Sequence, residues 1–318
     1  MKRVGILRGG AGEHYEFSLQ KGGDLISHIF ENLSHKYKTF DILIDKQGIW
    51  HINGVPINPA DLVHRVDVVW NVAGPEFSII LQNFSIPFIG QSFFSGSMEN
   101  SKDILREHMK KIGLKMPRTL LIPAYFEDID ARPTERGQSF GRGPRERYAI
   151  KKAKEIHEKF GSPWIIKSFT EDSGMVSPVG LWPRGIHLAK TFNELVAAIE
   201  DGVNHGKSIF VEEFIAGKPT ALHSIANFRG ENIYILPPEN LTAEEKEKLT
   251  GLVKDLHHHL DARHYLKSDF ILHPKRGVFL TEINFSPDLR KNSHLDKSLG
   301  SVGAKLDNMV EHILESTL

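Results

Sequence analysis

Residues 268–284 read Ser268-Asp269-Phe270-Ile271-Leu272-His273-Pro274-Lys275-Arg276-Gly277-Val278-Phe279-Leu280-Thr281-Glu282-Ile283-Asn284. Two largely apolar runs flank a turn that contains Pro and Gly, which predicts a β-hairpin. If the loop has four residues, His273 pairs with Val278. Counting back from that pair places Asp269 directly opposite Glu282.

The two opposed carboxylates predict a cation site. Like charges directly opposite each other destabilise a strand pair unless a positive group lies between them. Asn284 lies two residues beyond Glu282 and shares its face of the sheet. Oxygen ligands of this kind suit Mg²⁺, which keeps several waters and bridges phosphates. The alternative is a register slip that separates Asp269 from Glu282, and it would remove the site.

The first hundred residues alternate short apolar runs with helical patterns, which is typical of βαβ units and a parallel sheet. A helix over residues 101–112 follows, and Gly113 and Pro117 end this part of the chain. The expected strands are Val4–Leu7, Phe40–Ile44, Val66–Val72 and Ile86–Ile89.

The second half of the chain changes character, because strand-rich segments with helices between them favour an α+β arrangement. Capping boxes at residues 191–194 and 242–245 open two helices. The adjacent histidines 257–259 lie in the second helix, where successive side chains point about 100° apart. We therefore expect them to face solvent rather than share a metal ion. The expected domains are residues 1–117, 118–206 and 207–318.

Residues 132–147 form the least typical stretch. Their sixteen residues contain five Arg, three Gly and two Pro, with Phe140 as the one large apolar side chain. Such a segment buries too little surface to offset its ordering entropy, which predicts a mobile loop. It is either a plain solvated linker or a lid or arm that meets an anionic ligand or a partner.

Composition excludes several classes of protein. The chain has 318 residues, 40 Lys and Arg against 40 Asp and Glu, and no Cys. The lack of Cys excludes thiol nucleophiles, disulfides and Cys-ligated metals, and it favours a reducing, cytoplasmic location. Zero net charge argues against a broad nucleic-acid-binding face. No run of about 18 apolar residues is present, so we expect no membrane span.

Three further motifs carry polar groups at strand ends. Glu212 and Glu213 break an apolar strand that runs into Gly217, and the free backbone groups of such an edge suit a flat heterocycle such as adenine. Lys167 ends a short strand before a loop of small residues and is a candidate phosphate contact, although the sequence is not a Walker A motif. The glycine-rich segment 8–14 follows the first strand, and its amides suit an anion.

The order of the motifs along the chain is more specific than any one of them. They are Gly9-Gly10 with Glu16-Phe17-Ser18-Leu19, Ile86-Pro87-Phe88-Ile89-Gly90, Ser101-Lys102, Lys167 with Glu171-Asp172-Ser173, Val211–Gly217, Ser268-Asp269-Phe270, and Glu282-Ile283-Asn284-Phe285-Ser286-Pro287. In this order they resemble the ATP-grasp ligases, and within them the D-alanine–D-alanine ligases over nearly the whole chain.

The resemblance implies an α/β fold in which an N-terminal parallel-sheet domain precedes an ATP-grasp fold of two α+β lobes. It implies a cytoplasmic ligase that uses Mg²⁺ and ATP to phosphorylate the carboxylate of one small amino acid, after which a second amine attacks the acylphosphate. Such ligases serve the biosynthesis of peptidoglycan for the cell wall. A homodimer fits the same class of enzyme.

The resemblance also implies roles for single residues. Those that would bind the nucleotide are Lys102 and Lys167 at the phosphates, with Glu212, Glu213 and Ile215 at adenine. Those that would hold two Mg²⁺ ions, or Mn²⁺ as a substitute, are Asp269, Glu282 and Asn284. The residues of the catalytic set are Lys267 near the developing oxyanion, Ser293 at the second substrate's carboxylate, Ser173, and Glu13 or His14 at the first substrate's amino group.

Several positions depart from the family's pattern. Pro219 replaces the acid that holds the ribose, and Asp288 replaces the glycine whose amide stabilises the oxyanion. Residues 236–241 are too few to form the substrate-covering loop. The N-terminal signatures are reduced to Val72-Ala73-Gly74-Pro75-Glu76.

Three hypotheses follow from these matches and departures. The first is an active ligase of the D-alanine–D-alanine type. The second is a degenerate protein that binds Mg²⁺ and nucleotide without ligating. The third is a ligase for a different amino acid or small acid, which would explain why substrate-contacting positions diverge while Asp269, Glu282 and Asn284 persist.

Overall fold

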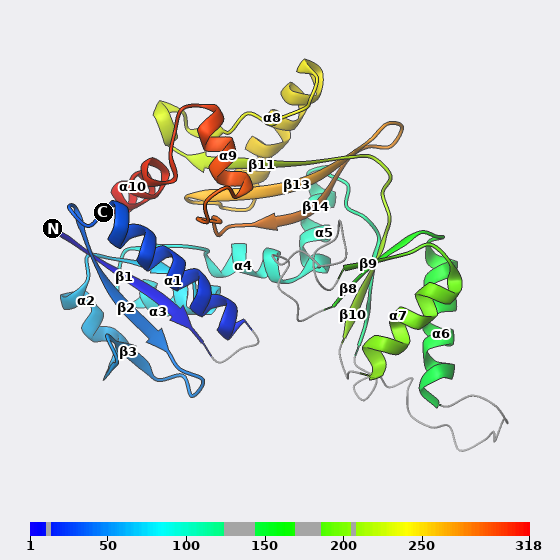
Figure 1. Ribbon diagram of the computed structural model, residues 1–318, viewed down its shortest axis with the longest axis horizontal. Coiled ribbons are helices and arrows are strands. Elements are labelled where there is room, and N and C mark those ends of the chain that lie inside the picture. The colour runs from blue at the N-terminus through cyan, green and yellow to red at the C-terminus, as the bar shows by residue number, and fades with distance from the viewer. Residues whose placement is uncertain (11–13, 124–143, 169–185, 205–207) are drawn as a thin grey trace. The chain divides into compact units, whose positions relative to one another are not determined.

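The computed structural model describes residues 1–10, 14–123, 144–168, 186–204 and 208–318 (Figure 1). The chain folds as two compact units. Unit 1 combines Met1–Lys115 with Lys218–Leu318, and unit 2 is the intervening segment Met116–Gly217. Each unit has a hydrophobic core of its own. The three expected domains, with boundaries after residues 117 and 206, stay a prediction.

The N-terminal part of unit 1 is built on a six-stranded sheet. In pairing order its strands are β4 (Val55–Ile57), β3 (Trp50–Ile52), β2 (Tyr37–Ile44), β1 (Lys2–Gly9), β5 (Val68–Asn71) and β6 (Phe88–Ile89). Strands β2, β1, β5 and β6 are parallel, which confirms the predicted parallel sheet. Strands β3 and β4 extend one edge antiparallel and were not predicted.

The first three helices of this part connect strands of the sheet, and the next two follow β6. They are α1 (Tyr15–Asn32), α2 (Leu62–Arg65) after a short 3₁₀ turn at Pro59–Asp61, α3 (Pro75–Asn83), α4 (Phe93–Asn100) and α5 (Lys102–Lys111). The hydroxyl of Ser101 accepts a hydrogen bond from the amide of Ile104 and so caps α5. Gly113 follows α5 with a φ of 71°, the left-handed conformation expected after the helix.

The second sheet of unit 1 is antiparallel. In pairing order its strands are β12 (Ile233–Ile235), β11 (Lys218–Ala226), β13 (Tyr265–His273) and β14 (Gly277–Asn284), and a 3₁₀ turn at Phe228–Gly230 joins β11 to β12. Helix α8 (Ala243–His259) lies over one face of this sheet (Figure 1), and the predicted capping box of Thr242 and Glu245 opens it. The chain ends with α9 (His294–Ser301) and α10 (Leu306–Thr317).

One core joins the two ends of the chain within unit 1. Buried residues of the parallel sheet and α1, such as Val4 and Ile29, pack in the same cluster as Ile225 of β11, Leu299 of α9 and Val310 of α10. The N-terminal sheet therefore depends on the last helices for part of its apolar cover.

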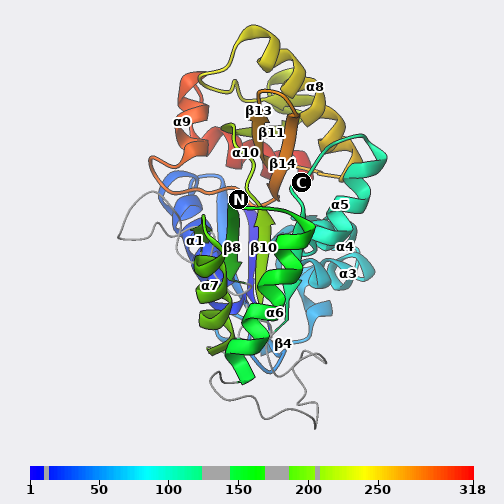
Figure 2. The ribbon, with the colours of Figure 1, turned by 90° about the vertical axis from the view of Figure 1, so that its right-hand side faces the viewer.

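Unit 2 is a four-stranded antiparallel sheet with two helices. In pairing order the strands are β7 (Thr119–Ile122), β10 (Ile209–Glu213), β8 (Trp164–Ser168) and β9 (Ile186–Ala189). The helices α6 (Pro144–Lys159) and α7 (Phe192–Asn204) lie side by side on one face of the sheet (Figure 2). Ile156 and Leu195 pack there against Ile166 and Val211.

The predicted loop over residues 132–147 is wrong at its end. Residues 144–147 form the first turn of α6, where Pro144 occupies a helix start, a position that tolerates its missing N–H. The rest of that prediction, residues 132–143, lies outside the described residues.

Among the described residues, no helix combines the length and the apolar character needed to cross a membrane.

Candidate functional site

The hairpin of β13 and β14 brings the two predicted carboxylates together. Asp269 pairs directly with Glu282. The predicted four-residue loop is wrong, because His273 pairs with Gly277 and the loop is one residue shorter. The register then shifts between Asp269 and Phe270, where β14 accommodates one extra residue in a β-bulge. The shorter loop and the extra residue in the bulge offset each other. Asp269 and Glu282 are therefore paired as predicted, although neither the loop length nor the bulge was predicted.

Four polar side chains share the face that carries this pair. Lys267 lies opposite Asn284, two residues along each strand from Asp269 and Glu282. The Lys267 ammonium lies 2.7 Å from Oδ2 of Asp269, with the two side chains 34% and 27% exposed. Burial raises the pKa of Asp269, and Glu282 acts in the same direction, whereas Lys267 opposes the shift. We call Lys267, Asp269, Glu282 and Asn284 the carboxylate face.

The donor set of the carboxylate face fits a small hard cation. Two carboxylates and one amide oxygen suit Mg²⁺, which takes few protein ligands and keeps several waters. Oδ2 of Asp269 is bound to Lys267, and Oδ1 of Asn284 accepts the amide of Ser286 at 2.7 Å, which leaves each group further acceptor capacity. In the part of the chain that the structure describes, no three His, Asp or Glu side chains cluster as a metal site.

A third acid, Glu99 on α4, lies near the carboxylate face and was missed by the sequence analysis. Burial raises the pKa of Glu99, and Glu282 acts in the same direction. Lys21 and a hydrogen bond from the Gln91 amide oppose that shift. The neighbouring motif Ser101-Lys102 had been recognised, but no periodic pattern marks Glu99.

The predicted catalytic residue Ser293 is the N-cap of α9. Its hydroxyl accepts the amide of Asp296 at 3.1 Å and donates to the carbonyl oxygen of Asp288 at 3.0 Å. The Asp288 carboxylate is bound by the Arg290 guanidinium through two bonds of 2.8 and 2.7 Å. Bidentate binding to Arg290 lowers the pKa of Asp288, so this carboxylate is charged.

Unit 2 brings together two of the predicted nucleotide-binding residues. Lys167 on β8 and Glu212 on β10 form an ion pair with an N–O distance of 3.0 Å, and their side chains are 20% and 6% exposed. Lys167 pairs with Phe210 in the sheet, two residues before Glu212, so both side chains lie on one face. A buried Glu whose charge is balanced by a Lys is a polar anchor in an otherwise apolar sheet.

The other predicted site residues are divided among the parts of the chain. Glu213 is buried and binds Arg118 at 2.8 Å, and Ile215 is buried as well. Lys102 is the first residue of α5 in unit 1. His14 precedes α1 and is exposed. Glu13 and Ser173 lie outside the described residues.

One of the three adjacent histidines contradicts the prediction that they face solvent. His257 is 3% exposed, and its Nδ1 lies 2.8 Å from the Ser224 hydroxyl. His258 is exposed as predicted. The sequence pattern does mark His257, which lies four residues after buried Val253 on the apolar face of α8.

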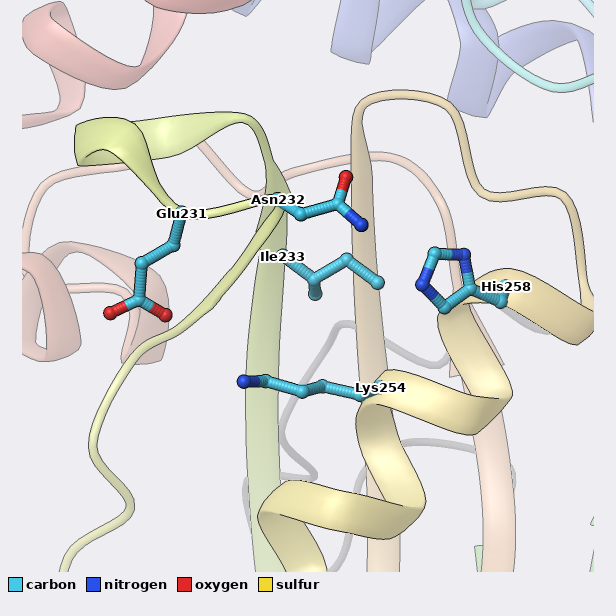
Figure 3. A pocket seen from close by; sticks show the side chains of 5 residues that line it. All are labelled: Glu231, Asn232, Ile233, Lys254 and His258. Atoms are coloured by element: carbon cyan, nitrogen blue, oxygen red, sulfur yellow. The ribbon is translucent and has the colours of Figure 1, made fainter.

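A hollow of about 320 Å³ lies on the α8 side of the second sheet (Figure 3). Its lining residues are Glu231, Asn232, Ile233, Lys254 and His258. Asn232 and His258 point toward each other across Ile233 (Figure 3). Since His257 of α8 binds Ser224, and Ser224 points away from its neighbour His223, α8 covers the face opposite the carboxylate face. The hollow is therefore separate from the candidate site.

Comparison with known proteins gives similarities to D-alanine–D-alanine ligases. A family model described as D-ala D-ala ligase C-terminus matches residues 222–315. A D-alanine–D-alanine ligase of Oceanobacillus iheyensis is 22% identical over 99% of this chain and 94% of that protein. The solved D-alanyl-alanine synthetase A of Vibrio cholerae has a TM-score of 0.70 at 16% identity, covering 99% of this chain and 98% of that one. A D-alanine–D-alanine ligase of Bacillus anthracis, solved with ATP, has a TM-score of 0.66 at 17% identity, covering 100% and 97%.

The parallel N-terminal sheet and the antiparallel sheets that follow match the folds of these solved D-alanine–D-alanine ligase structures, and the paired carboxylates lie where the resemblance to ATP-grasp ligases predicted them. The comparisons thus support a divergent protein that is similar to the D-alanine–D-alanine ligases, as the resemblance had predicted.

Proposed function

We propose that this protein is an ATP-dependent carboxylate–amine ligase that joins two small amino acids through an acylphosphate. The observation that carries the proposal is the direct pairing of Asp269 with Glu282, with Asn284 and Lys267 on the same face. This arrangement supplies charged oxygen ligands at the position where the family's matched residues hold a metal. The relatives, which are D-alanine–D-alanine ligases, make D-alanine the first substrate to test.

The roles of the site residues are part of the proposal. Asp269, Glu282 and Asn284 would hold two Mg²⁺ ions, for which Mn²⁺ can substitute. Bound Mg²⁺ would neutralise charge on the phosphates during phosphoryl transfer. Lys267 would then turn from Asp269 toward the developing oxyanion. An ammonium keeps the positive charge of the family's arginine but lacks its bidentate fork.

The remaining assignments follow the resemblance position by position. Lys102 and Lys167 would contact phosphates, with Glu212, Glu213 and Ile215 at adenine. Glu13 or His14 would hold the first amino group, and Ser173 and Ser293 complete the predicted catalytic set. A cytoplasmic location, a homodimer, a role in peptidoglycan biosynthesis and the lack of nucleic-acid or membrane partners belong to the same proposal.

Phosphate release from ATP with Mg²⁺ tests the proposal. The wild-type protein is supplied with single D- and L-amino acids, and release that depends on an amino acid is expected. Asp269→Asn, which keeps the shape of the side chain but removes its charge, should reduce that release at least 100-fold. Asp255→Asn on α8 is a matched control, because Asp255 is exposed and lies on the helix over the opposite face.

The pattern of release separates the hypotheses. Release with D-alanine and formation of the dipeptide supports a ligase of the relatives' type. Release with another amino acid supports a ligase with a different substrate. Measurable ATP binding without amino-acid-dependent release would contradict the ligase proposal and leave a nucleotide-binding protein.

A further inference from the structure

A chain of three hydrogen-bonded side chains leads from the core of unit 1 to its surface. The Tyr265 hydroxyl lies 2.7 Å from Nδ1 of His223, and Nε2 of His223 lies 2.7 Å from Nδ1 of His294. Tyr265 and His223 are 3% and 2% exposed, whereas His294 is exposed. We call Tyr265, His223 and His294 the relay. His223 pairs with Lys267 in the sheet, so the relay ends beside the carboxylate face.

The direction of donation along the relay is determined by its buried end. Burial raises the pKa of Tyr265 well above its ordinary value, so the hydroxyl keeps its hydrogen. Among the described residues, Nδ1 of His223 is the acceptor that this hydroxyl reaches. Tyr265 therefore donates to Nδ1, and a neutral His223 must carry its own hydrogen on Nε2. That hydrogen is donated to Nδ1 of His294, so His294 carries its hydrogen on Nε2.

The histidines of the relay stay neutral. Burial lowers the pKa of His223 to about 3. Burial and Lys267 lower the pKa of His294, although Asp269 and Glu239 act in the opposite direction. A proton added to Nδ1 of His294 would also point at the Nε2–H of His223 and remove their hydrogen bond. His294 thus presents the N–H donor of a neutral ring at the surface, and its hydrogen bond to His223 fixes the orientation of that ring.

Ser293, the residue before His294, already donates its hydroxyl hydrogen within the protein. A serine hydroxyl has one hydrogen, and that of Ser293 is donated to the carbonyl oxygen of Asp288. Its oxygen already accepts the amide of Asp296 as the cap of α9. Donation from Ser293 to a carboxylate would therefore require breaking its bond to Asp288.

We infer that the Nε2–H of His294, rather than the hydroxyl of Ser293, binds the α-carboxylate of the second substrate, the amino acid whose amine attacks. The inference rests on the proposed ligase function and moves the predicted carboxylate contact by one residue. A carboxylate is the matching ligand, because an N–H bond to a charged oxygen is stronger than one to a neutral oxygen. The nearby ammonium of Lys267 adds positive potential that favours an anion.

Competition between two second substrates tests the inference. D-Alanine and D-alaninamide have the same amine, but the amide lacks the carboxylate, and it serves as second substrate only. Both are supplied together with Mg²⁺ and ATP, and the ratio of the two products is measured by mass spectrometry. The ratio is independent of how much protein is folded. The wild-type protein is expected to prefer D-alanine.

Three variants give the expected pattern. His294→Leu, which has no donor, should lower the preference for D-alanine at least tenfold. His294→Gln, whose amide nitrogen lies near the position of Nε2, should keep part of it. Ser293→Ala should change it less than threefold. An unchanged ratio in His294→Leu, or loss of the preference in Ser293→Ala alone, would overturn the inference.

A readout without turnover separates this inference from the proposed function. Ring ¹⁵N spectra of the full-length protein should show the hydrogen on Nε2 of both His223 and His294, and Tyr265→Phe should disturb the His223 signal. Addition of D-alanine, but not D-alaninamide, should shift the His294 signal. A hydrogen on Nδ1 of His294 overturns the inference even if the protein is a ligase. The expected tautomers and shift without any dipeptide product overturn the ligase reaction but support carboxylate binding at His294.

Discussion

Asp269 and Glu282 lie directly opposite each other across β13 and β14, at a position where Cβ atoms of paired residues are about 5 Å apart. Lys267 balances the first of these charges, and Asn284 adds an uncharged oxygen on the same face. The two carboxylates repel each other at this distance, and a divalent cation bound between them would replace the repulsion by attraction.

Mg²⁺ should stabilise the protein through this pair. A ligand that binds the folded state alone raises the free energy of unfolding by about 2.7 kcal/mol at 100 times its Kd. Thermal unfolding with increasing MgCl₂ should thus move to higher temperature in the wild-type protein and in Asp255→Asn, but not in Asp269→Asn. NaCl at equal ionic strength is the control for screening. The same upward shift in Asp269→Asn would exclude Asp269 as a metal ligand.

Glu99→Gln should weaken the same binding without abolishing it. Glu99 lies close enough to Glu282 for Glu282 to raise its pKa, so removing the Glu99 carboxylate lowers the negative potential near the carboxylate face. The Mg²⁺ concentration at half-maximal stabilisation is expected to rise a few-fold. Glu76→Gln on α3 is a control of the same chemistry. No difference between the two variants would indicate that Glu99 is neutral or screened from the site.

Breaking the ion pair of Lys167 and Glu212 should destabilise unit 2. Lys167→Met removes the ammonium that lies 3.0 Å from the 6%-exposed Glu212, and breaking a buried ion pair from one side lowers stability by about 3 kcal/mol. Lys152→Met on α6 is the control, because its partner Glu155 is 42% exposed and the expected loss is under about 1 kcal/mol. Urea unfolding of both variants checks the difference. Equal losses would show that solvent screens the Lys167 pair as well.

Stability should fall as the pH drops below about 6.5. Burial lowers the pKa of His257 to about 4, so between these values the unfolded chain binds the proton and the folded one does not. The contribution of His257 is therefore complete above its unfolded pKa and decreases as the pH falls toward about 4. Its share of the slope approaches about 1.4 kcal/mol per pH unit.

His257→Phe tests this contribution, since it removes the titrating group from the buried face of α8. The free energy of unfolding, measured by urea between pH 7.5 and 4.5, should decrease less steeply by that share. His258→Gln removes the exposed neighbour and should leave the slope unchanged. Equal slopes in wild type and His257→Phe would mean that His257 titrates alike in both states.

Local signals in the sequence predicted most of the architecture. The parallel sheet followed from spaced apolar runs, and the α8 capping box from Thr242 and Glu245. Counting residues back from the hairpin loop predicted the pairing of Asp269 with Glu282, although neither the true loop length nor the bulge was predicted. Side chains alternate between the two faces of a strand, so a shift by one residue moves a side chain to the other face. The residue missing from the loop and the extra residue in β14 offset each other, and both carboxylates therefore stay on one face.

The parts that were not predicted depend on contacts between distant segments. Glu282 raises the pKa of Glu99 across a tertiary contact, and no spacing in the sequence records that proximity. The relay from Tyr265 through His223 to His294 joins two strands and a helix, so none of its residues is near another in sequence. The hydrogen bonding of Ser293 depends on the conformation of residues 288–293, which a motif match does not describe.

The shared core of unit 1 has a consequence for synthesis on the ribosome. The first 115 residues are synthesised before the segment 218–318 that completes their core, and the intervening unit 2 is synthesised between them. Unit 2 is contiguous, so it can finish folding while the N-terminal sheet still exposes apolar surface. Ile29 and its neighbours therefore remain partly uncovered until α9 and α10 have been synthesised, and we expect this part of the protein to expose apolar surface longest during translation.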